Sequence, residues 1–293
     1  MSKRRNLKKS VSNMSLTIFE ARKWASSFLK ENNREARVAE ILLRFLLNKS
    51  LNEWLIIQSD PLDEEIWNTY EAWIKEHALT GKPVEHFTNE AEFFGRIFYV
   101  DENVLIPRPE TEELLLTIKD EIQDNDTIVD IGTGSGIIAI TLKLEKPKTT
   151  VFATDLSNDA LEVARKNAQN HHAEVKFLQG SFLNPIIREK IEPTMIVSNP
   201  PYIPNEERVH LDETVLHDPE LALFAENNGL AAYEQIIDQI FLLEKMPRLI
   251  AFEIGYDQGK TVPQLIYEKD ANANVQVIQD INGKDRIVVW KNE

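Results

Sequence analysis

The sequence has 293 residues and is acidic, with 48 Asp and Glu residues against 33 Lys and Arg residues and a formal net charge of −15. Its hydrophobic fraction of 42% is ordinary for a folded protein, and the length suits one large or two modest domains. The lack of cysteine excludes a disulfide scaffold, a cysteine-ligated metal and a thiol nucleophile. No apolar run approaches the ~18 residues that span a bilayer, and the N-terminus lacks the apolar segment of a secretory signal. We therefore expect a cytoplasmic protein that does not contact a membrane.

Basic residues gather at the N-terminus, and acidic residues dominate the rest of the chain. Residues 1–13 hold five Lys and Arg residues and no acid, residues 14–88 hold 9 basic against 12 acidic residues, and residues 89–293 hold 19 against 36. A nucleic-acid-binding protein normally presents a basic face, because phosphate neutralisation supplies much of its affinity. We therefore predict that residues 1–14 form a basic disordered tail and that the body of the protein does not bind nucleic acid directly.

Helical periodicity dominates residues 15–88. Apolar side chains recur at the i, i+3, i+4, i+7 spacing of a buried helix face in two segments that begin at Ile18 and Val38. Asp60 and Pro61 predict the N-cap and the first turn of a third, longer helix. Four of the five tryptophans lie in this region, which indicates a small aromatic core, although a groove for a partner would show the same pattern. The prediction is an N-terminal helical domain over residues 15–88.

Residues 89–109 are predicted to form a β-hairpin linker. Two runs with strand character, residues 93–100 and 104–106, flank a turn-like stretch at residues 101–103.

From residue 110 onward, strands and helices are predicted to alternate. Apolar, β-rich runs occur at residues 127–131, 150–154, 174–178, 194–198, 248–254, 274–279 and 286–290. Helical stretches lie between most of them, at residues 136–146, 158–170, 230–244 and 257–268. This alternation is typical of an α/β fold with a doubly wound, mainly parallel sheet, here of seven strands. The last two runs are expected to form an antiparallel hairpin at one edge.

A glycine-rich turn follows the first strand of this sheet. Gly132, Gly134 and Gly136 stand at alternate positions before a helix start, where they let the backbone turn tightly and approach a ligand. Asp155 ends the second strand, the place from which an acid accepts hydrogen bonds from ribose hydroxyls. A nicotinamide dehydrogenase is one reading, but the spacing is G-x-G-x-G rather than G-x-G-x-x-G. Asp130, just before the loop, suits a positively charged cofactor better than a pyrophosphate, so the constellation resembles class I S-adenosylmethionine-dependent methyltransferases.

An Asn-Pro-Pro-Tyr tetrapeptide, residues 199–202, follows the predicted fourth strand. Ligands in open α/β sheets bind at the carboxyl ends of the strands, so this turn is expected to face the glycine loop. The two prolines remove backbone donors, which leaves the Asn199 side-chain oxygen and the Pro200 carbonyl as acceptors. Such a rim suits the two hydrogens of a planar NH₂ group, whose nitrogen is a poor nucleophile until it is oriented. The segment that continues to residue 223 is expected to cover the substrate.

Motifs on either side of the tetrapeptide indicate which family of methyltransferases the sequence resembles. The chain resembles the release factor glutamine methyltransferase family, the HemK-type protein-(glutamine-N5) methyltransferases, from about Ser15 to Trp290. The motifs that carry the resemblance are Gly81-Lys82-Pro83, Glu92-Phe93-Phe94-Gly95, Leu105-Ile106-Pro107-Arg108-Pro109-Glu110-Thr111, the glycine loop, Val197-Ser198-Asn199-Pro200-Pro201-Tyr202-Ile203 and Glu253-Ile254-Gly255.

The resemblance implies a class I methyltransferase domain over residues 110–293. It further implies methyl transfer from S-adenosylmethionine, with S-adenosylhomocysteine as product, to the side-chain amide of the glutamine in the Gly-Gly-Gln motif of peptide-chain release factors. The helical domain would then help to hold the release factor. We expect a monomer, and we expect no metal because the methyl donor is already activated.

The resemblance also assigns residues to the site. Those expected to bind the cofactor are Gly132, Thr133, Gly134, Ser135, Gly136, Asp155 and Phe182, with Asn199 between cofactor and substrate. Those expected to bind the glutamine are Asn199, Pro200, Pro201 and Tyr202, and catalysis is assigned to Asn199, Pro200 and Tyr202. Arg108, held between two prolines, either contacts a ligand or forms an ion pair with Glu110 or Glu112.

Two other functions remain open at this point. An adenine-N6 methyltransferase acting on DNA or RNA shares the Asn-Pro-Pro-Tyr signature, but it predicts a basic target-recognition region that the acidic body does not supply. A non-catalytic cofactor-binding scaffold predicts a degraded glycine loop or tetrapeptide, and both motifs are intact.

Overall fold

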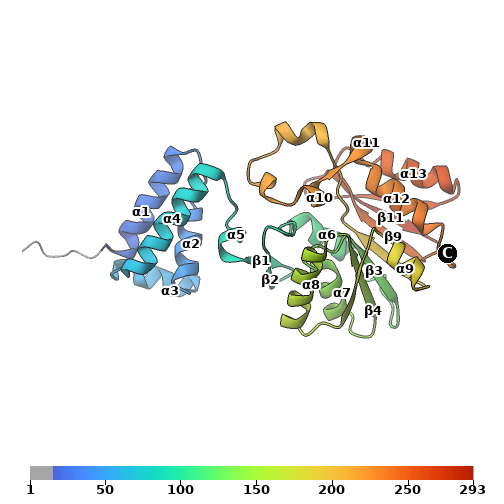
Figure 1. Ribbon diagram of the computed structural model, residues 1–293, viewed down its shortest axis with the longest axis horizontal. Helices are drawn as coiled ribbons and strands as arrows, with labels where there is room; N and C mark the ends of the chain where they lie inside the picture. The colour runs from blue at the N-terminus through green and yellow to red at the C-terminus, as the bar shows by residue number, and fades with distance from the viewer. Residues whose placement is uncertain (1–15, 293) are drawn as a thin grey trace, which may run out of the picture. The chain divides into compact units, whose positions relative to one another are not determined.

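The computed structural model describes residues 16–292, and the chain divides after Thr88 into two compact units (Figure 1). The predicted basic tail, residues 1–14, lies outside the described residues. Within residues 16–292, no helix is both long enough and apolar enough to cross a bilayer.

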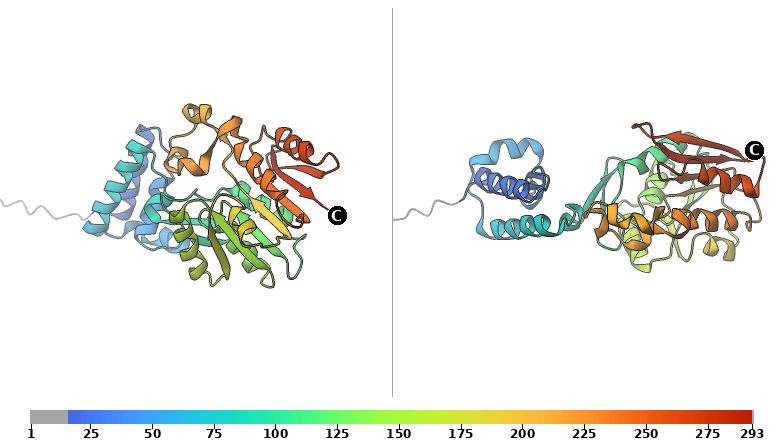
Figure 2. Two further views of the ribbon diagram at one scale, coloured as in Figure 1. Left: turned by 45° about the vertical axis from the view of Figure 1, so that its right-hand side comes forward. Right: turned by 90° about the horizontal axis from the view of Figure 1, so that it is seen from above.

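The first unit is a small helical bundle. Its elements are α1 (Ile18–Glu31), α2 (Val38–Leu46), α3 (Leu51–Ile56), the 3-10 helix η1 (Ile57–Ser59), α4 (Glu64–Thr80) and α5 (Glu85–Thr88). Helices α1, α2 and α4 pack against one another (Figures 1 and 2). The tryptophans contribute to this core, since the rings of Trp24 and Trp67 meet edge to face at 5.0 Å. The buried Tyr70 hydroxyl donates a hydrogen bond of 2.8 Å to the carbonyl of Ala39, which ties α4 to α2.

Two details of this unit differ from the sequence prediction. Helix α4 begins at Glu64 with Asp63 as its N-cap, so the predicted cap at Asp60 is wrong. Pro61 instead forms an isolated bridge with Thr17, because the chain stays extended before the cap. Helix α3 was missed, although Ser50 and Glu53 form a capping box that is visible in the sequence.

The second unit opens with the hairpin of β1 (Glu90–Phe93) and β2 (Arg96–Tyr99). A hairpin was predicted here, but its turn was misplaced. Phe94 and Gly95 form the turn with φ of 51° and 70°, so the run that was interpreted as one strand folds back on itself. Asn167 on α8 (Asn158–Asn170) accepts from the amide of Tyr99 at 2.7 Å and donates to its carbonyl at 2.9 Å. The hairpin is therefore fastened to the second unit.

A seven-stranded sheet forms the centre of the second unit, as predicted. Its strands are β3 (Thr127–Ile131), β4 (Thr150–Asp155), β5 (Val175–Gln179), β6 (Met195–Ser198), β9 (Leu249–Glu253), β10 (Asn274–Gln279) and β11 (Asp285–Lys291). The spatial order is β10-β11-β9-β6-β3-β4-β5. Pairing is parallel from β9 to β5, whereas β11 runs antiparallel to both of its neighbours. The predicted antiparallel edge hairpin, β10–β11, is confirmed.

Helices cover both faces of this sheet (Figures 1 and 2). They are α6 (Pro109–Ile118), α7 (Ile137–Glu145), α9 (Asn184–Arg188), α12 (Ala231–Ile240) and α13 (Thr261–Lys269), together with α8. Alternate strand residues feed two hydrophobic clusters: Ile128 packs with α6, α7 and α8, and Val129 packs with α9, α12 and α13. This two-sided burial explains why the strands are apolar throughout.

The sheet aligns three chain reversals at the carboxyl ends of neighbouring strands. The glycine loop follows β3, Asp155 ends β4, and Asn199 follows β6. Short elements cover this edge: β7 (Ile203–Pro204), the 3-10 helices η2 (Asn205–His210) and η3 (Val215–His217), α10 (Glu220–Leu223), β8 (Phe224–Ala225) and α11 (Glu226–Gly229).

Candidate active site

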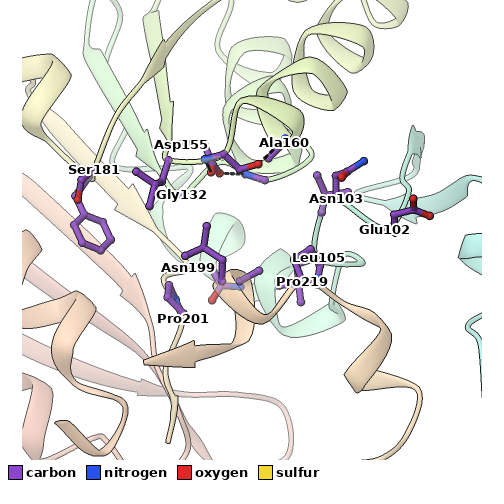
Figure 3. A pocket seen from close by; sticks show the side chains of 17 residues that line it. Glu102, Asn103, Leu105, Gly132, Asp155, Ala160, Ser181, Asn199, Pro201 and Pro219 are labelled. Carbon is purple, nitrogen blue, oxygen red and sulfur yellow. Dashed lines mark hydrogen bonds between the residues drawn. The ribbon is translucent and has the colours of Figure 1, made fainter. Parts of the chain in front are cut away.

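A cavity of about 270 Å³ lies at the carboxyl ends of β3, β4 and β6. Figure 3 shows the side chains of Asp155 and Asn199 approaching it from opposite sides. Phe182, also in its wall, was predicted beside the cofactor. The lining residues that no site assignment named are the stretch from Glu102 to Leu105, Leu156, Ser157, Ala160, Ser181, Pro219, Leu221 and Ala222.

The glycine loop borders this cavity with main chain. Gly132 and Gly134 line it, both have positive φ, and a Cβ added to either would meet no protein atom within 4 Å. These two positions therefore leave room for a ligand to approach the backbone. Gly136 has a different function, because it packs against α8, where an added Cβ would come within 3.2 Å of the Ala164 Cβ.

Asp130 holds the loop from beneath. Its Oδ2 accepts hydrogen bonds from the Thr133 hydroxyl at 2.6 Å and from the Ala139 amide at 3.2 Å. The side chain is fully buried and is not in the cavity wall, so its charge supports the loop rather than facing a ligand directly. Burial raises the pKa of Asp130 to about 7, and the nearby charge of Asp155 adds to the shift.

Asp155 faces the cavity and also braces the loop. Its Oδ2 accepts from the Gly134 amide at 2.9 Å, and its Oδ1 accepts from the Ser157 amide at 2.9 Å. Burial raises the pKa of this carboxyl, while these main-chain donors oppose the shift. Each oxygen keeps lone pairs that can accept hydrogen bonds from a ligand's hydroxyls.

A second cavity of about 290 Å³ lies beside the first, and Asn199 stands in the wall of both. Tyr202, Glu253 and Arg286 also line the second cavity. The Ser198 hydroxyl donates to the Ile131 carbonyl at 2.7 Å, which fixes the end of β6 against β3 just before the tetrapeptide. Leu105 and Ala222 also line both cavities, so the two spaces share a wall that Asn199 helps to form.

The tetrapeptide's last residue is fixed by its neighbours. Gln258 donates from Nε2 to the Tyr202 carbonyl at 3.2 Å, while its Oε1 accepts from the Gly255 amide at 2.9 Å. Gly229, with φ of 80°, lies so close that an added Cβ would stand 2.1 Å from the Tyr202 carbonyl oxygen. These contacts hold the main chain of Tyr202 in place.

Arg108 holds the covering segment, the short elements between Ile203 and Gly229 that lie over the edge of the sheet. Its guanidinium donates to the buried Asp218 carboxylate at 2.5 Å, and the other Asp218 oxygen accepts from the Ile106 amide at 3.2 Å. The predicted ion pair of Arg108 is confirmed, but its partner is Asp218 rather than Glu110 or Glu112. Because Arg108 also lines the second cavity, its guanidinium contributes to the wall as well as to this pair.

The predicted site residues divide into two groups. Those that line one or both cavities are Gly132, Gly134, Asp155, Phe182, Asn199, Pro201, Tyr202 and Arg108. Thr133, Ser135, Gly136 and Pro200 lie outside both linings and form the framework behind them. Within residues 16–292, no group of three or more His, Asp or Glu side chains is arranged to hold a metal ion.

Sequence comparisons place the chain in a family. The family model for the methyltransferase small domain matches residues 109–226, and that for the PrmC N-terminal domain matches residues 20–88. The release factor glutamine methyltransferase of Bacillus subtilis is 40% identical over 279 residues, which cover 93% of this chain and 96% of the relative. The chain belongs to the release factor glutamine methyltransferase family.

Other comparisons agree. The Staphylococcus aureus release factor glutamine methyltransferase is 46% identical over 214 residues, 73% of this chain and 77% of that relative. Among solved structures, the hMettl16 catalytic domain in complex with MAT2A 3'UTR hairpin 1 has a TM-score of 0.56 at 14% identity and covers 85% of this chain and 90% of its own. At that identity the likeness concerns the fold alone, and it supports the predicted class I methyltransferase architecture.

Proposed function

We propose that this protein transfers the methyl group of S-adenosylmethionine to the side-chain amide nitrogen of the glutamine in the Gly-Gly-Gln motif of peptide-chain release factors. The observation that carries the proposal is Asn199, which lies in the wall shared by two cavities. A methyl transfer needs donor and acceptor to meet at one point, and a shared wall provides such a point.

The first cavity suits the methyl donor. Asp155 would accept hydrogen bonds from the ribose hydroxyls, and the main chain at Gly132 and Gly134 leaves room for the ligand to approach. Phe182 would pack beside the adenine. When bound, S-adenosylmethionine supplies a methyl group on a sulfonium centre, and we propose that no metal takes part.

Asn199 and Tyr202 of the second cavity, together with the main chain of Pro200 just outside its lining, would prepare the acceptor. The lone pair of an amide nitrogen is delocalised, so the nitrogen attacks only when it is oriented and its N–H groups are held. The Asn199 Oδ1 would accept one N–H, the Pro200 carbonyl would accept the other, and Tyr202 would pack on the amide face. Fixed acceptors of this kind contribute on the order of several kcal/mol to a transition state without a strong base.

The remaining assignments follow from the family and from charge. The helical unit over residues 15–88 would help to hold the release factor, and residues 110–293 would carry catalysis. We propose a cytoplasmic location, because the proposed substrate works in translation. The acidic body, with 36 Asp and Glu residues against 19 Lys and Arg residues after residue 88, favours a protein substrate over nucleic acid. We propose that the enzyme acts as a monomer.

One experiment tests the proposal directly. The protein is incubated with methyl-labelled S-adenosylmethionine and, separately, a release factor, the same release factor with the Gly-Gly-Gln glutamine changed to alanine, duplex DNA and structured RNA. Mass spectrometry then locates the label. We expect label only on the intact motif; label on a nucleic acid, or on the alanine variant, would overturn the proposal.

Matched variants connect the result to the site. Asn199→Ala should reduce transfer at least 100-fold, because the acceptor that orients the amide is lost. Asn170→Ala removes an exposed asparagine at the end of α8 and should keep full activity. Equal loss in both variants would point to general destabilisation rather than to the site.

A further inference from the structure

A series of hydrogen bonds joins Asn199 to Thr111 and then to Glu253, which lies in the wall of the second cavity. The Asn199 Nδ2 lies 3.2 Å from the Thr111 Oγ1, and the Thr111 hydroxyl donates to the Glu253 Oε2 at 2.7 Å. Thr111 and Glu253 are each 1% exposed. This chain of hydrogen bonds links α6 to β9, two elements that meet only in the folded protein.

The chemistry of these groups decides which of them donates and which accepts in each hydrogen bond. An ionised carboxylate has no proton, so the Thr111 hydroxyl must donate its single proton to Glu253. Only oxygen lone pairs then remain for Asn199, and of the two ends of the Asn199 amide only the NH₂ end can donate to them. The NH₂ end therefore turns towards Thr111, and the carbonyl oxygen is left to serve the cavities.

We propose that Thr111 and Glu253 are positioning residues that hold the Asn199 side chain with its carbonyl oxygen towards the substrate amide. This inference rests on the proposed function, in which that oxygen accepts an N–H of the glutamine. Without the chain, the amide could turn over and present its NH₂ group to another NH₂ group, which would repel the substrate rather than orient it.

Glu253 has a defined electrostatic environment. Arg286 on β11 and the Tyr202 side chain favour its charged form, whereas Glu110 on α6 disfavours it. The Tyr233 hydroxyl on α12 donates to its main-chain carbonyl at 2.8 Å. Burial outweighs the favourable contacts and raises the pKa of Glu253 to about 7. The carboxylate that directs the chain is thus present above neutral pH, and it is lost as the pH falls below 7.

Substitution of Thr111 tests this series of hydrogen bonds, because it should lower kcat without changing the affinity for S-adenosylmethionine. Thr111→Val keeps the shape but removes the hydroxyl, so kcat on the release factor should fall about tenfold, which corresponds to the loss of one oriented hydrogen bond. Thr111→Ser restores the hydroxyl and should recover most of the rate. The control is Thr117→Val, which removes a hydroxyl from the same helix that bonds only to the Glu113 carbonyl among the described residues.

A purely structural role for Thr111 would give a different result. S-adenosylmethionine affinity, measured by calorimetry, should stay within about twofold in Thr111→Val because the substitution lies behind the cavity wall. If Thr111→Val keeps the wild-type kcat, or if Thr111→Ser is as slow as Thr111→Val, the inference is overturned. A parallel loss of cofactor binding and kcat would likewise contradict positioning.

Glu253→Gln supplies a second, independent readout. In the wild type, kcat at saturating S-adenosylmethionine should fall as the pH drops below about 7, because protonated Glu253 no longer enforces the direction of the chain. Glutamine offers both a donor and an acceptor at every pH. This variant should therefore have a lower kcat that does not fall further as the pH drops below about 7. Retention of the same fall in kcat in Glu253→Gln would overturn the inference.

The failure of this inference can be told apart from the failure of the proposed function. If the wild-type enzyme leaves the Gly-Gly-Gln glutamine unmethylated, the proposed function falls and the inference falls with it. If the wild type methylates that glutamine but the Thr111 and Glu253 variants behave like the wild type, only the inference falls.

Discussion

Asp130 makes the stability of the second unit depend on pH in a way that one substitution isolates. Its Oδ2 has two donors, but its Oδ1 is buried with no hydrogen-bond partner among the described residues. Burial raises the pKa of this carboxyl from 3.8 to about 7. The folded protein therefore keeps a proton that the unfolded chain has already released between these two pH values.

Proton linkage gives the sign and the size of the effect of Asp130 on the free energy of unfolding. Where the folded state binds the extra proton, the free energy of unfolding falls by about 1.36 kcal/mol for each unit rise in pH. From pH 5 to pH 8 the contribution of Asp130 is thus a loss of about 2.7 kcal/mol, most of which occurs below pH 7. Asp130→Asn removes this titration but adds a constant cost of about 1–3 kcal/mol, since its NH₂ group has no acceptor at the Oδ1 position.

The assay compares Asp130→Asn with the wild type at pH 5 and at pH 8. Hydrogen exchange with mass spectrometry, corrected for the intrinsic rate at each pH, gives the opening free energy of peptides from β3 and α7. Stability of the variant minus that of the wild type should rise by about 2.7 kcal/mol from pH 5 to pH 8. A difference that stays constant, or that falls with pH, would refute the reasoning, whatever the constant cost is.

Three further substitutions probe the framework. Gly136→Ala should lower the free energy of unfolding by about 2–3 kcal/mol in urea denaturation, because φ is 84° and the new Cβ would lie 2.9 Å from the Ile140 side chain. Asp218→Asn removes the charged partner of Arg108 and should raise the KM for both substrates several-fold in steady-state assays, since the covering segment lines both cavities. Asn167→Ala removes a buried side chain whose three hydrogen bonds join the hairpin, α8 and the glycine loop; we expect a loss of about 3 kcal/mol by thermal unfolding and weaker cofactor binding by calorimetry.

Each of these expectations has an outcome that contradicts it. A Gly136→Ala protein as stable as the wild type would show that α8 yields to the added methyl group. An unchanged KM in Asp218→Asn would mean that the segment keeps its place without the ion pair. An unchanged cofactor affinity in Asn167→Ala would show that the hydrogen bonds from the hairpin do not support the glycine loop.

The sheet was predictable because its strands are buried on both faces. Ile128 and Val129 are neighbours that pack on opposite sides of β3, so burial makes the whole run apolar and the run stands out in the sequence. The site's position was predictable for a related reason. Asp155 and Asn199 follow strands of a parallel sheet, and the carboxyl ends of such strands meet at one edge.

Pairings between distant residues were not predictable in the same way. Arg108 pairs with Asp218 across 110 positions, whereas the nearby Glu110 and Glu112 were the partners that local spacing suggested. No periodicity marks the covering segment, because its short elements depend on contacts with the rest of the unit. The hairpin turn was misplaced because a bulky residue, Phe94, takes the left-handed conformation that usually indicates Gly or Asn.

The wall shared by the two cavities has a thermodynamic consequence. In the proposed function, a ligand on either side would contact Asn199, so occupancy of one cavity would restrict the side chain that the other ligand meets. Coupling of this kind is reciprocal: whatever factor the cofactor contributes to substrate affinity, the substrate contributes to cofactor affinity. In the proposed function, cofactor binding and release factor binding would therefore be linked, and the affinity for S-adenosylhomocysteine would change when a release factor is bound.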